Sequence, residues 1–214
     1  MNSQKLTAAL VLMLLALVAV FGGRTLREKG VQLWVSGAGA AQRVKGNPGA
    51  DLKIVEHIDY QCGACREAAL VLGDYQKKYP ERFQIEVKFH PLSGHPHGLL
   101  SAVYAECAAR QQKFWAFHEG LFERQAEWSP QTNPVGVFRE VALKAGANLK
   151  SLEACVDDEK TRDSVMKEKA EGTAKGIQMT PTFFFNGKML VGTRALLEEL
   201  GQQFPHERKA GKAA

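Results

Sequence analysis

Residues 51–65 read DLKIVEHIDYQCGAC, and this stretch decides the fold. Asp51–Tyr60 has the length and β-branched content of a strand, and it runs directly into the pair Cys62 and Cys65. Apolar residues then recur every three or four positions up to Pro80, which predicts a helix with one buried face. We therefore expect Cys65 to be buried in this helix and Cys62 to lie at its N-terminus. The apolar positions are Cys65, Ala68, Leu72, Tyr75 and Tyr79.

The sequence on either side extends this strand and helix into an α/β fold. Phe83–Leu92 alternates apolar and polar residues like a second strand, which completes a βαβ unit. Residues 98–175 have helical periodicity throughout. Strand signals return at Thr182–Phe185 and Lys188–Val191, with Asn186-Gly187 between them as a hairpin turn. A final amphipathic helix is marked by Leu196, Leu197, Leu200 and Phe204.

A cysteine at a helix N-terminus is chemically activated. Unpaired backbone N–H groups and the positive end of the helix dipole stabilise its thiolate, and the pKa of such a thiol falls to about 3.5–7. The thiolate is the nucleophile in thiol–disulfide exchange. Cys62 is therefore the candidate nucleophile. Cys65, one turn further on, is the candidate resolving cysteine that attacks a mixed disulfide on Cys62.

Glu56 and Thr180-Pro181 are further candidates for this chemistry. Glu56 interrupts an apolar strand six residues before Cys62. Either it points under the cysteine pair, where burial would raise its pKa and make it a proton acceptor for Cys65, or it lies at a strand edge in water. Pro181 enters a predicted strand, where proline is typical of a strand start or a cis peptide bond. A cis bond would leave the Thr180 backbone free to pair with an extended substrate.

With these motifs in this order, the chain resembles the DsbA-like branch of the thioredoxin superfamily, the thiol:disulfide oxidoreductases of the bacterial cell envelope. The stretches that carry the resemblance are VEHIDYQCGAC (55–65), AECAARQQKFWAFHEGLF (105–122) and GIQMTPTFFFNGKMLVG (176–192). The resemblance implies a thioredoxin fold formed by residues 51–97 and 176–205, with residues 98–175 as an inserted α-helical domain.

The resemblance also implies an activity. Cysteine-containing extracytoplasmic proteins would be the substrates, a membrane redox partner would reset the cysteine pair, and no cofactor would be needed. The implied site residues are the nucleophile Cys62, the resolving Cys65, the buried acid Glu56, and a substrate-binding surface of Thr180, Pro181, Gly63 and Ala64.

The sequence leaves the direction of the exchange open. Strongly oxidising members of the family resemble the motif CPHC. In this chain Gly63-Ala64 stands between the two cysteines and supplies no cation, which leaves the helix N-terminus and Arg66 to stabilise the thiolate. The family favours oxidation of substrate thiols. A disulfide reductase or isomerase, kept reduced by a membrane partner, is the alternative.

Cys107 and Cys155 are two distant single cysteines. The resemblance implies that they pair inside the helical insertion, as they do in some relatives. From the residues alone they are either two buried free thiols or a structural disulfide, and an oxidising compartment favours the disulfide.

The N-terminus predicts membrane targeting. Residues 6–23 are uncharged and rich in Leu, Ala and Val, and a run of about 18 such residues favours an uncleaved anchor over a cleaved signal peptide within residues 1–24. Residues 25–50 are expected to form a flexible linker, and residues 206–214 a frayed tail. Basic residues after the apolar run would place the domain in the cytoplasm, but this rule is weak for long domains. Because redox cysteines need an oxidising space, we expect the periplasmic or extracytoplasmic side, tethered to the inner membrane.

Composition argues against two other classes of protein. The formal net charge of +5 comes largely from the two ends of the chain, and no basic stripe predicts nucleic-acid binding. A zinc site would need further ligands, and no second Cys-x-x-Cys accompanies Cys62 and Cys65, so no metal is expected. A membrane-tethered metal-binding or chaperone module is the alternative from another class. The sequence also contains a cluster of histidines, which we expect to cap the first insertion helix and to line a loop. Its members are His90, His95 and His97.

Overall fold

The computed structural model describes residues 40 and 42–206 of the chain. The apolar run at residues 6–23, most of the expected linker and residues 207–214 lie outside this part. Within it, no helix is both long enough and apolar enough to cross a membrane. The elements in chain order are β1 (Val44–Gly46), β2 (Leu52–Ile58), α3 (Gly63–Lys78), the 3-10 helix η1 (Pro80–Arg82), β3 (Phe83–Phe89), α4 (Gly98–Arg110), α5 (Phe114–Glu123), α6 (Gln125–Trp128), α7 (Val135–Lys144), α8 (Leu149–Val156), α9 (Glu159–Ala174), β4 (Thr182–Phe185), β5 (Lys188–Val191) and α10 (Gly192–Gln203).

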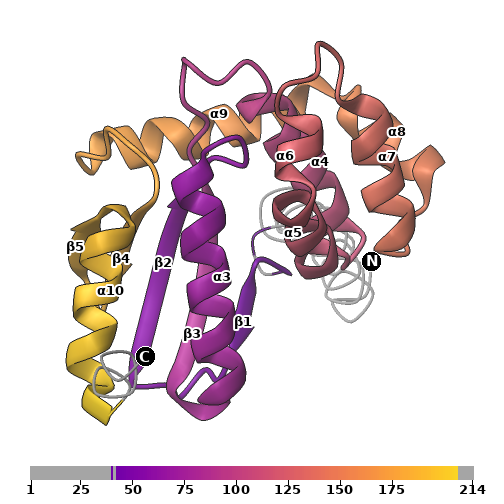
Figure 1. Cartoon of the computed structure of the whole chain (residues 1–214). Coiled ribbons are helices and arrows are strands. Elements are labelled where there is room, and N and C mark those ends of the chain that lie inside the picture. Colours follow the sequence, from indigo (N-terminus) through magenta and orange to yellow (C-terminus); the bar gives the residue numbers. More distant parts are fainter. Residues whose placement is uncertain (1–39, 41, 207–214) are drawn as a thin grey trace, which may run out of the picture. The chain divides into compact units, whose positions relative to one another are not determined.

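The strands form one mixed sheet in the order β1-β3-β2-β4-β5 (Figure 1). β2 runs parallel to β3, as the predicted βαβ unit requires, and antiparallel to β4. β4 and β5 form the predicted hairpin, in which Asn186 and Gly187 have φ angles of 48° and 83°. Such positive φ angles match the twist that a two-residue hairpin needs. β2 is therefore the central strand, with neighbours on both sides.

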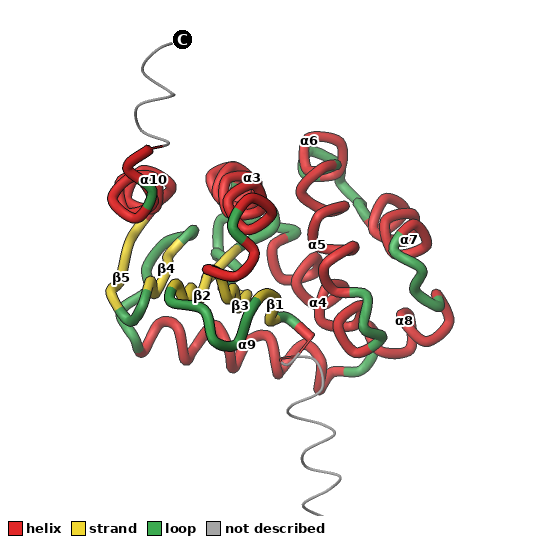
Figure 2. The backbone as a smooth tube through the Cα atoms, turned by 90° about the horizontal axis from the view of Figure 1, so that it is seen from below, coloured by secondary structure: helices red, strands yellow, loops and turns green. Residues whose placement is uncertain are grey.

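Helices cover both faces of this sheet. Figure 2 shows α3 and α10 on one face, α9 on the opposite face, and α4 to α8 grouped beyond β1. The strand residues that face α3 and α10 form a hydrophobic core with them, which includes Leu72, Phe183 and Leu200. The sequence pattern also predicts Leu197 in this core, but its side chain is 45% exposed, because it lies on the outer face of α10. The thioredoxin-type α/β arrangement with a block of helices is confirmed.

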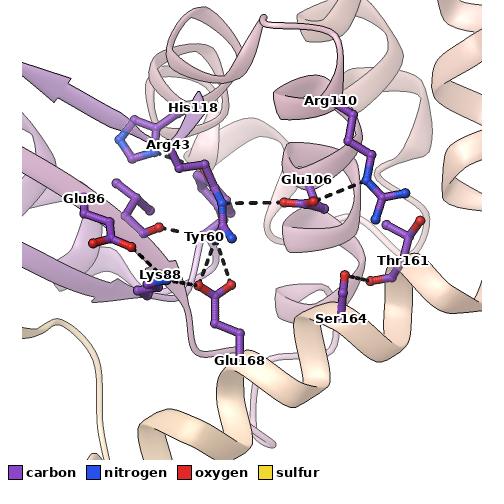
Figure 3. A network of polar contacts seen from close by, with 11 residues as sticks. Arg43, Tyr60, Glu86, Lys88, Glu106, Arg110, His118, Thr161, Ser164 and Glu168 are labelled. Carbon is purple, nitrogen blue, oxygen red and sulfur yellow. Dashed lines mark hydrogen bonds and ion pairs between the residues drawn. The ribbon is translucent and has the colours of Figure 1, made fainter. Parts of the chain in front are cut away.

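The expected flexible linker is wrong for residues 43–50. Val44–Gly46 forms β1 and pairs antiparallel with β3. Arg43 is only 6% exposed, and its guanidinium binds the Glu168 carboxylate of α9 at 2.8 Å (Figure 3). It forms a second ion pair with the Glu106 carboxylate of α4 at 3.5 Å. Its guanidinium also lies 4.3 Å from the centre of the Phe89 ring. This segment is held by contacts that are distant in sequence, which glycine content does not reveal.

A disulfide closes the helical block. Cys107 of α4 and Cys155 of α8 are bonded, with an S–S distance of 2.09 Å and a sequence separation of 48 residues. The alternative of two free thiols is therefore wrong. In the chain-entropy model, closing a loop of this length stabilises the folded state by about 4 kcal/mol.

Candidate active site

The cysteine pair lies where β2 passes into α3. Cys62 is the N-cap residue of α3, with extended backbone angles and no side-chain capping bond. Its side chain is half-buried, whereas Cys65, one turn later, is fully buried against the sheet. Gly63 and Ala64 between them are exposed. Both thiols are free in this structure, so the pair is in its reduced form.

The two thiols differ strongly in acidity. The pKa of Cys62 is lowered to about 5, first by a hydrogen bond from the Cys65 thiol, and then by the backbone N–H groups of Cys65 and Ala64, while burial opposes the shift. Burial raises the pKa of Cys65, and the neighbouring Cys62 raises it further. Donors at the start of α3 thus favour the thiolate on Cys62 and leave the proton on Cys65. Arg66, considered as a second source of stabilisation, instead donates to the Phe122 carbonyl at 3.0 Å.

The loop before β4 contacts this pair. The Thr180-Pro181 peptide bond is cis, as the sequence allows. The Thr180 carbonyl lies 3.4 Å from Sγ of Cys62 and accepts a hydrogen bond from it when Cys62 is protonated. Thr193, near the start of α10, donates from its hydroxyl to the Ala64 carbonyl at 3.1 Å. The structure therefore brings both predicted parts of the substrate-binding surface next to the nucleophile.

Glu56 lies inside the sheet and not at its edge. It is 2% exposed, on central strand β2, opposite Val87 of β3 and Phe183 of β4. Its Oε1 atom has no hydrogen-bond partner among the described residues. Burial raises the pKa of Glu56 to about 8, against an opposing attraction from Lys45. The alternative of a strand edge in water is therefore wrong, while the role of Glu56 as a proton acceptor for Cys65 stays a prediction.

A second carboxylate, on Asp59, holds the turn before Cys62. Its buried oxygens accept from the backbone N–H groups of Gln61 at 2.8 Å and Leu92 at 2.7 Å. They also contact Nδ1 of His95 at 2.8 Å. Gly98 passes so close that a Cβ there would lie 2.6 Å from Asp59 Oδ2. No motif marks Asp59, because its partners Leu92 and His95 lie 33 and 36 positions away in sequence.

The histidine cluster has more varied roles than capping and loop lining. His97 is the N-cap residue of α4, but its ring bonds the Gln131 carbonyl at 2.7 Å and provides no cap. His95 binds Asp59, and His90 is buried beside His57 on the sheet face. In the part of the chain that the structure describes, no three His, Cys, Asp or Glu side chains are grouped so as to hold a metal ion.

The helical insertion also contacts the redox turn, the residues 59–62 that lead into α3, through a residue that no sequence motif marks. Gln125 of α6 is 7% exposed, and its side-chain amide donates to the carbonyls of Tyr60 and Cys62. A lone glutamine in a four-residue helix carries no sequence signal for such a role. Only the fold brings it to the cysteine pair.

These features define a thioredoxin-type redox site, and comparison with known proteins agrees. A family model described as thioredoxin matches residues 39–201, and the chain belongs to this family. It is 28% identical over 155 residues to disulfide bond formation protein D of Bacillus subtilis, covering 70% of this chain and 69% of that protein.

Solved structures show the same fold. BdbD from Bacillus subtilis, in its oxidised form, superposes with a TM-score of 0.65 at 24% identity, covering 78% of this chain and 93% of that one. The α-DsbA1 protein of Wolbachia pipientis superposes with a TM-score of 0.60 at 22% identity, covering 67% of this chain and 73% of that one. The expected resemblance to DsbA-like proteins is confirmed.

Some relatives are much longer than the matching part. The chain is 29% identical over 150 residues to the Na(+)/H(+) antiporter NhaA of Herminiimonas arsenicoxydans, covering 70% of this chain but only 23% of that protein. The similarity to this relative therefore concerns less than a quarter of its length.

Proposed function

We propose that this protein is an extracytoplasmic thiol:disulfide oxidoreductase that oxidises the thiols of substrate proteins. The carrying observation is the placement of the two cysteines, Cys62 at the N-terminus of α3 and Cys65 buried one turn later, which lowers the pKa of Cys62 to about 5 and raises that of Cys65. A stabilised thiolate favours the reduced form of the pair, and a pair whose reduced form is stabilised is a stronger oxidant. A relative named for disulfide bond formation supports the same direction.

The exchange takes place in two steps. A substrate thiolate attacks Sγ of Cys62 in the Cys62–Cys65 disulfide, which forms a mixed disulfide and releases Cys65 as a thiolate. A second substrate thiolate then attacks the substrate sulfur and releases the Cys62 thiolate. The substrate gains a disulfide and loses two electrons, which the cysteine pair gains. In the reverse direction Cys65 attacks the mixed disulfide on Cys62.

Glu56 is the proposed proton carrier for Cys65. Cys65 is fully buried, so it must gain a proton when it is released from the disulfide as a thiolate. It must lose that proton before it attacks a mixed disulfide. A carboxyl whose pKa is raised to about 8 holds a proton near neutral pH and can also release it. Glu56 is two residues from both Ile54 and Ile58 on β2, so the three side chains point to the same face of the sheet. Ile54 packs in one cluster with Leu72 of α3 and Ile58 in another with Cys65, so Glu56 lies on the same side of the sheet as Cys65.

The proposed location and partners follow from this chemistry. The Cys107–Cys155 disulfide is of a kind that persists in oxidising compartments, which supports the extracytoplasmic side. A membrane redox partner would reoxidise the cysteine pair after each turnover, and residues 6–23 would tether the domain to the membrane. Cysteine-containing proteins would dock across Thr180-Pro181 and the exposed Gly63-Ala64.

Measurement of the reduction potential, combined with trapping, tests this proposal. We expect a two-electron couple above about −150 mV, whereas a value near about −270 mV would favour the alternative of a reductase or isomerase. Cys62→Ala should abolish oxidation of a reduced peptide, and Cys65→Ala should accumulate covalent complexes on Cys62. Full activity of Cys62→Ala would contradict the proposal.

A further inference from the structure

Gln125 is the link between the helical insertion and the redox turn. Its Nε2 atom donates to the Tyr60 carbonyl at 2.7 Å and to the Cys62 carbonyl at 2.9 Å. Both N–H bonds of the amide are thus directed at carbonyls on either side of Gln61. The side chain is 7% exposed, so water does not readily replace it.

Other bonds hold the same stretch of the insertion against the turn. Gln61 donates from Nε2 to the Ser129 carbonyl at 3.2 Å. The His97 ring contacts the Gln131 carbonyl, and Arg66 donates to the Phe122 carbonyl. These bonds fix α6 in place, so the position of Gln125 does not depend on its own two contacts alone.

The two contacts have an electrostatic consequence for Cys62. Carbonyl oxygens carry partial negative charge, which disfavours a thiolate nearby. A donor on the Cys62 carbonyl offsets this charge. It also polarises the Cys62–Gly63 peptide, whose N–H group belongs to the first residue of α3, because hydrogen bonds in a chain strengthen one another. The amide of Gln125 therefore offsets the negative charge of two carbonyls beside the thiolate, whose own backbone donors are the N–H groups of Ala64 and Cys65.

We propose that Gln125 is a positioning residue through which the helical insertion holds the redox turn and stabilises the Cys62 thiolate. The inference deepens the proposed function and rests on it for its effect on exchange. Its effect on Cys62 can be measured without any substrate.

The test replaces the amide and measures the thiol in the reduced full-length chain. Gln125→Met keeps the length of the side chain and removes both donors. We expect the Cys62 pKa, followed by the ultraviolet absorbance of the thiolate, to rise by ~0.5–1 unit, because the partial negative charge of the two carbonyls is then no longer offset beside the thiolate. The reduction potential should shift toward that of a weaker oxidant.

Gln131→Met is the matched control. The Gln131 side chain donates to the Glu127 carbonyl in the same stretch, away from the cysteine pair, so its loss should leave the Cys62 pKa unchanged. A folded Gln125→Met protein whose Cys62 pKa equals that of the unaltered chain would overturn the proposal.

A measurement on the unaltered chain decides the case if Gln125→Met does not fold. The side-chain amide resonance of Gln125 should shift in NMR spectra as Cys62 titrates, and that of Gln131 should not. A Gln125 resonance that stays constant through the titration would overturn the proposal. Failure of the proposed function would look different, because the unaltered chain would then not exchange disulfides with a reduced peptide.

Discussion

Glu56 and Cys62 are six residues apart, yet their surroundings shift their acidities in opposite directions. Burial raises the pKa of Glu56 to about 8, and its Oε1 atom has no hydrogen-bond partner among the described residues. Cys62 is only half-buried, and the Cys65 thiol and the backbone N–H groups of α3 lower its pKa to about 5. Burial thus dominates the pKa of Glu56, whereas hydrogen-bond donors dominate that of Cys62.

The burial of Glu56 predicts a pH-dependent loss of stability. A carboxyl whose pKa rises from 4.5 to about 8 on folding binds more protons in the folded state, so it destabilises the protein as pH rises through that window. Glu56→Gln should therefore raise the free energy of unfolding at pH 8 by up to about 5 kcal/mol, and by little at about pH 4.5. Urea denaturation of the reduced protein at both pH values measures the difference.

Glu67→Gln is the control for this experiment, because Glu67 lies exposed on α3. It should change stability equally little at both pH values. A Glu56→Gln protein with the same pH dependence as the unaltered chain would show that folding does not raise the pKa of Glu56.

The residues of the site differ in how far the sequence reveals them. Cys62 and Cys65 are evident from their spacing and their place between a strand and a helix. The burial of Glu56 cannot be decided from the sequence, because it depends on β3 and β4 pairing on both sides of β2. Asp59 and Gln125 act through partners far away in sequence, so no local pattern marks them.

Among the elements, α9 comes very close to the sheet at a glycine. A Cβ added to Gly172 would lie 2.8 Å from Nδ1 of His90 and 3.3 Å from Nδ1 of His57. Both rings are buried, at 3% and 2% exposure, and neither Nδ1 atom has a hydrogen-bond partner among the described residues. The absence of a side chain at Gly172 therefore sets how closely the helix approaches β2 and β3.

Two alanine substitutions separate this packing from helix propensity. Gly73 lies within α3 with no atom within 4 Å of an added Cβ, so Gly73→Ala should stabilise the protein by up to about 1 kcal/mol. Gly172→Ala should destabilise it by about 1–3 kcal/mol, because buried rings must move. Thermal unfolding of both variants measures the difference. A gain of stability in both variants would show that a Cβ at position 172 fits between α9 and the buried histidine rings.

Element boundaries follow the sequence closely where the signal is local. Pro80 ends α3 and Asn186-Gly187 forms the hairpin, as the residue types require. β1 cannot be predicted from the sequence, because three residues in a glycine-rich stretch show no hydrophobic periodicity. Its existence depends on pairing with β3, which lies far along the chain, and on the buried ion pair of Arg43 with Glu168.

In the folded domain, the sheet, the insertion and the loop before β4 all converge on one turn. β2 and α3 place Cys62, the cis peptide brings the Thr180 carbonyl to it, and α6 supplies Gln125. The Cys107–Cys155 disulfide ties together two helices of the insertion that supplies this glutamine. The thioredoxin-type order of elements is predictable from the motifs. The contacts between insertion and turn are not, because they join residues that are 63 and 65 positions apart.

The central claim is that this arrangement holds Cys62 as a thiolate at neutral pH. The most direct test is a pH titration of the thiolate absorbance in the reduced full-length chain, with Cys62→Ala identifying the signal. We expect a midpoint near pH 5, well separated from that of Cys65. A midpoint near the value of a free cysteine, about 8.5, would contradict the claim.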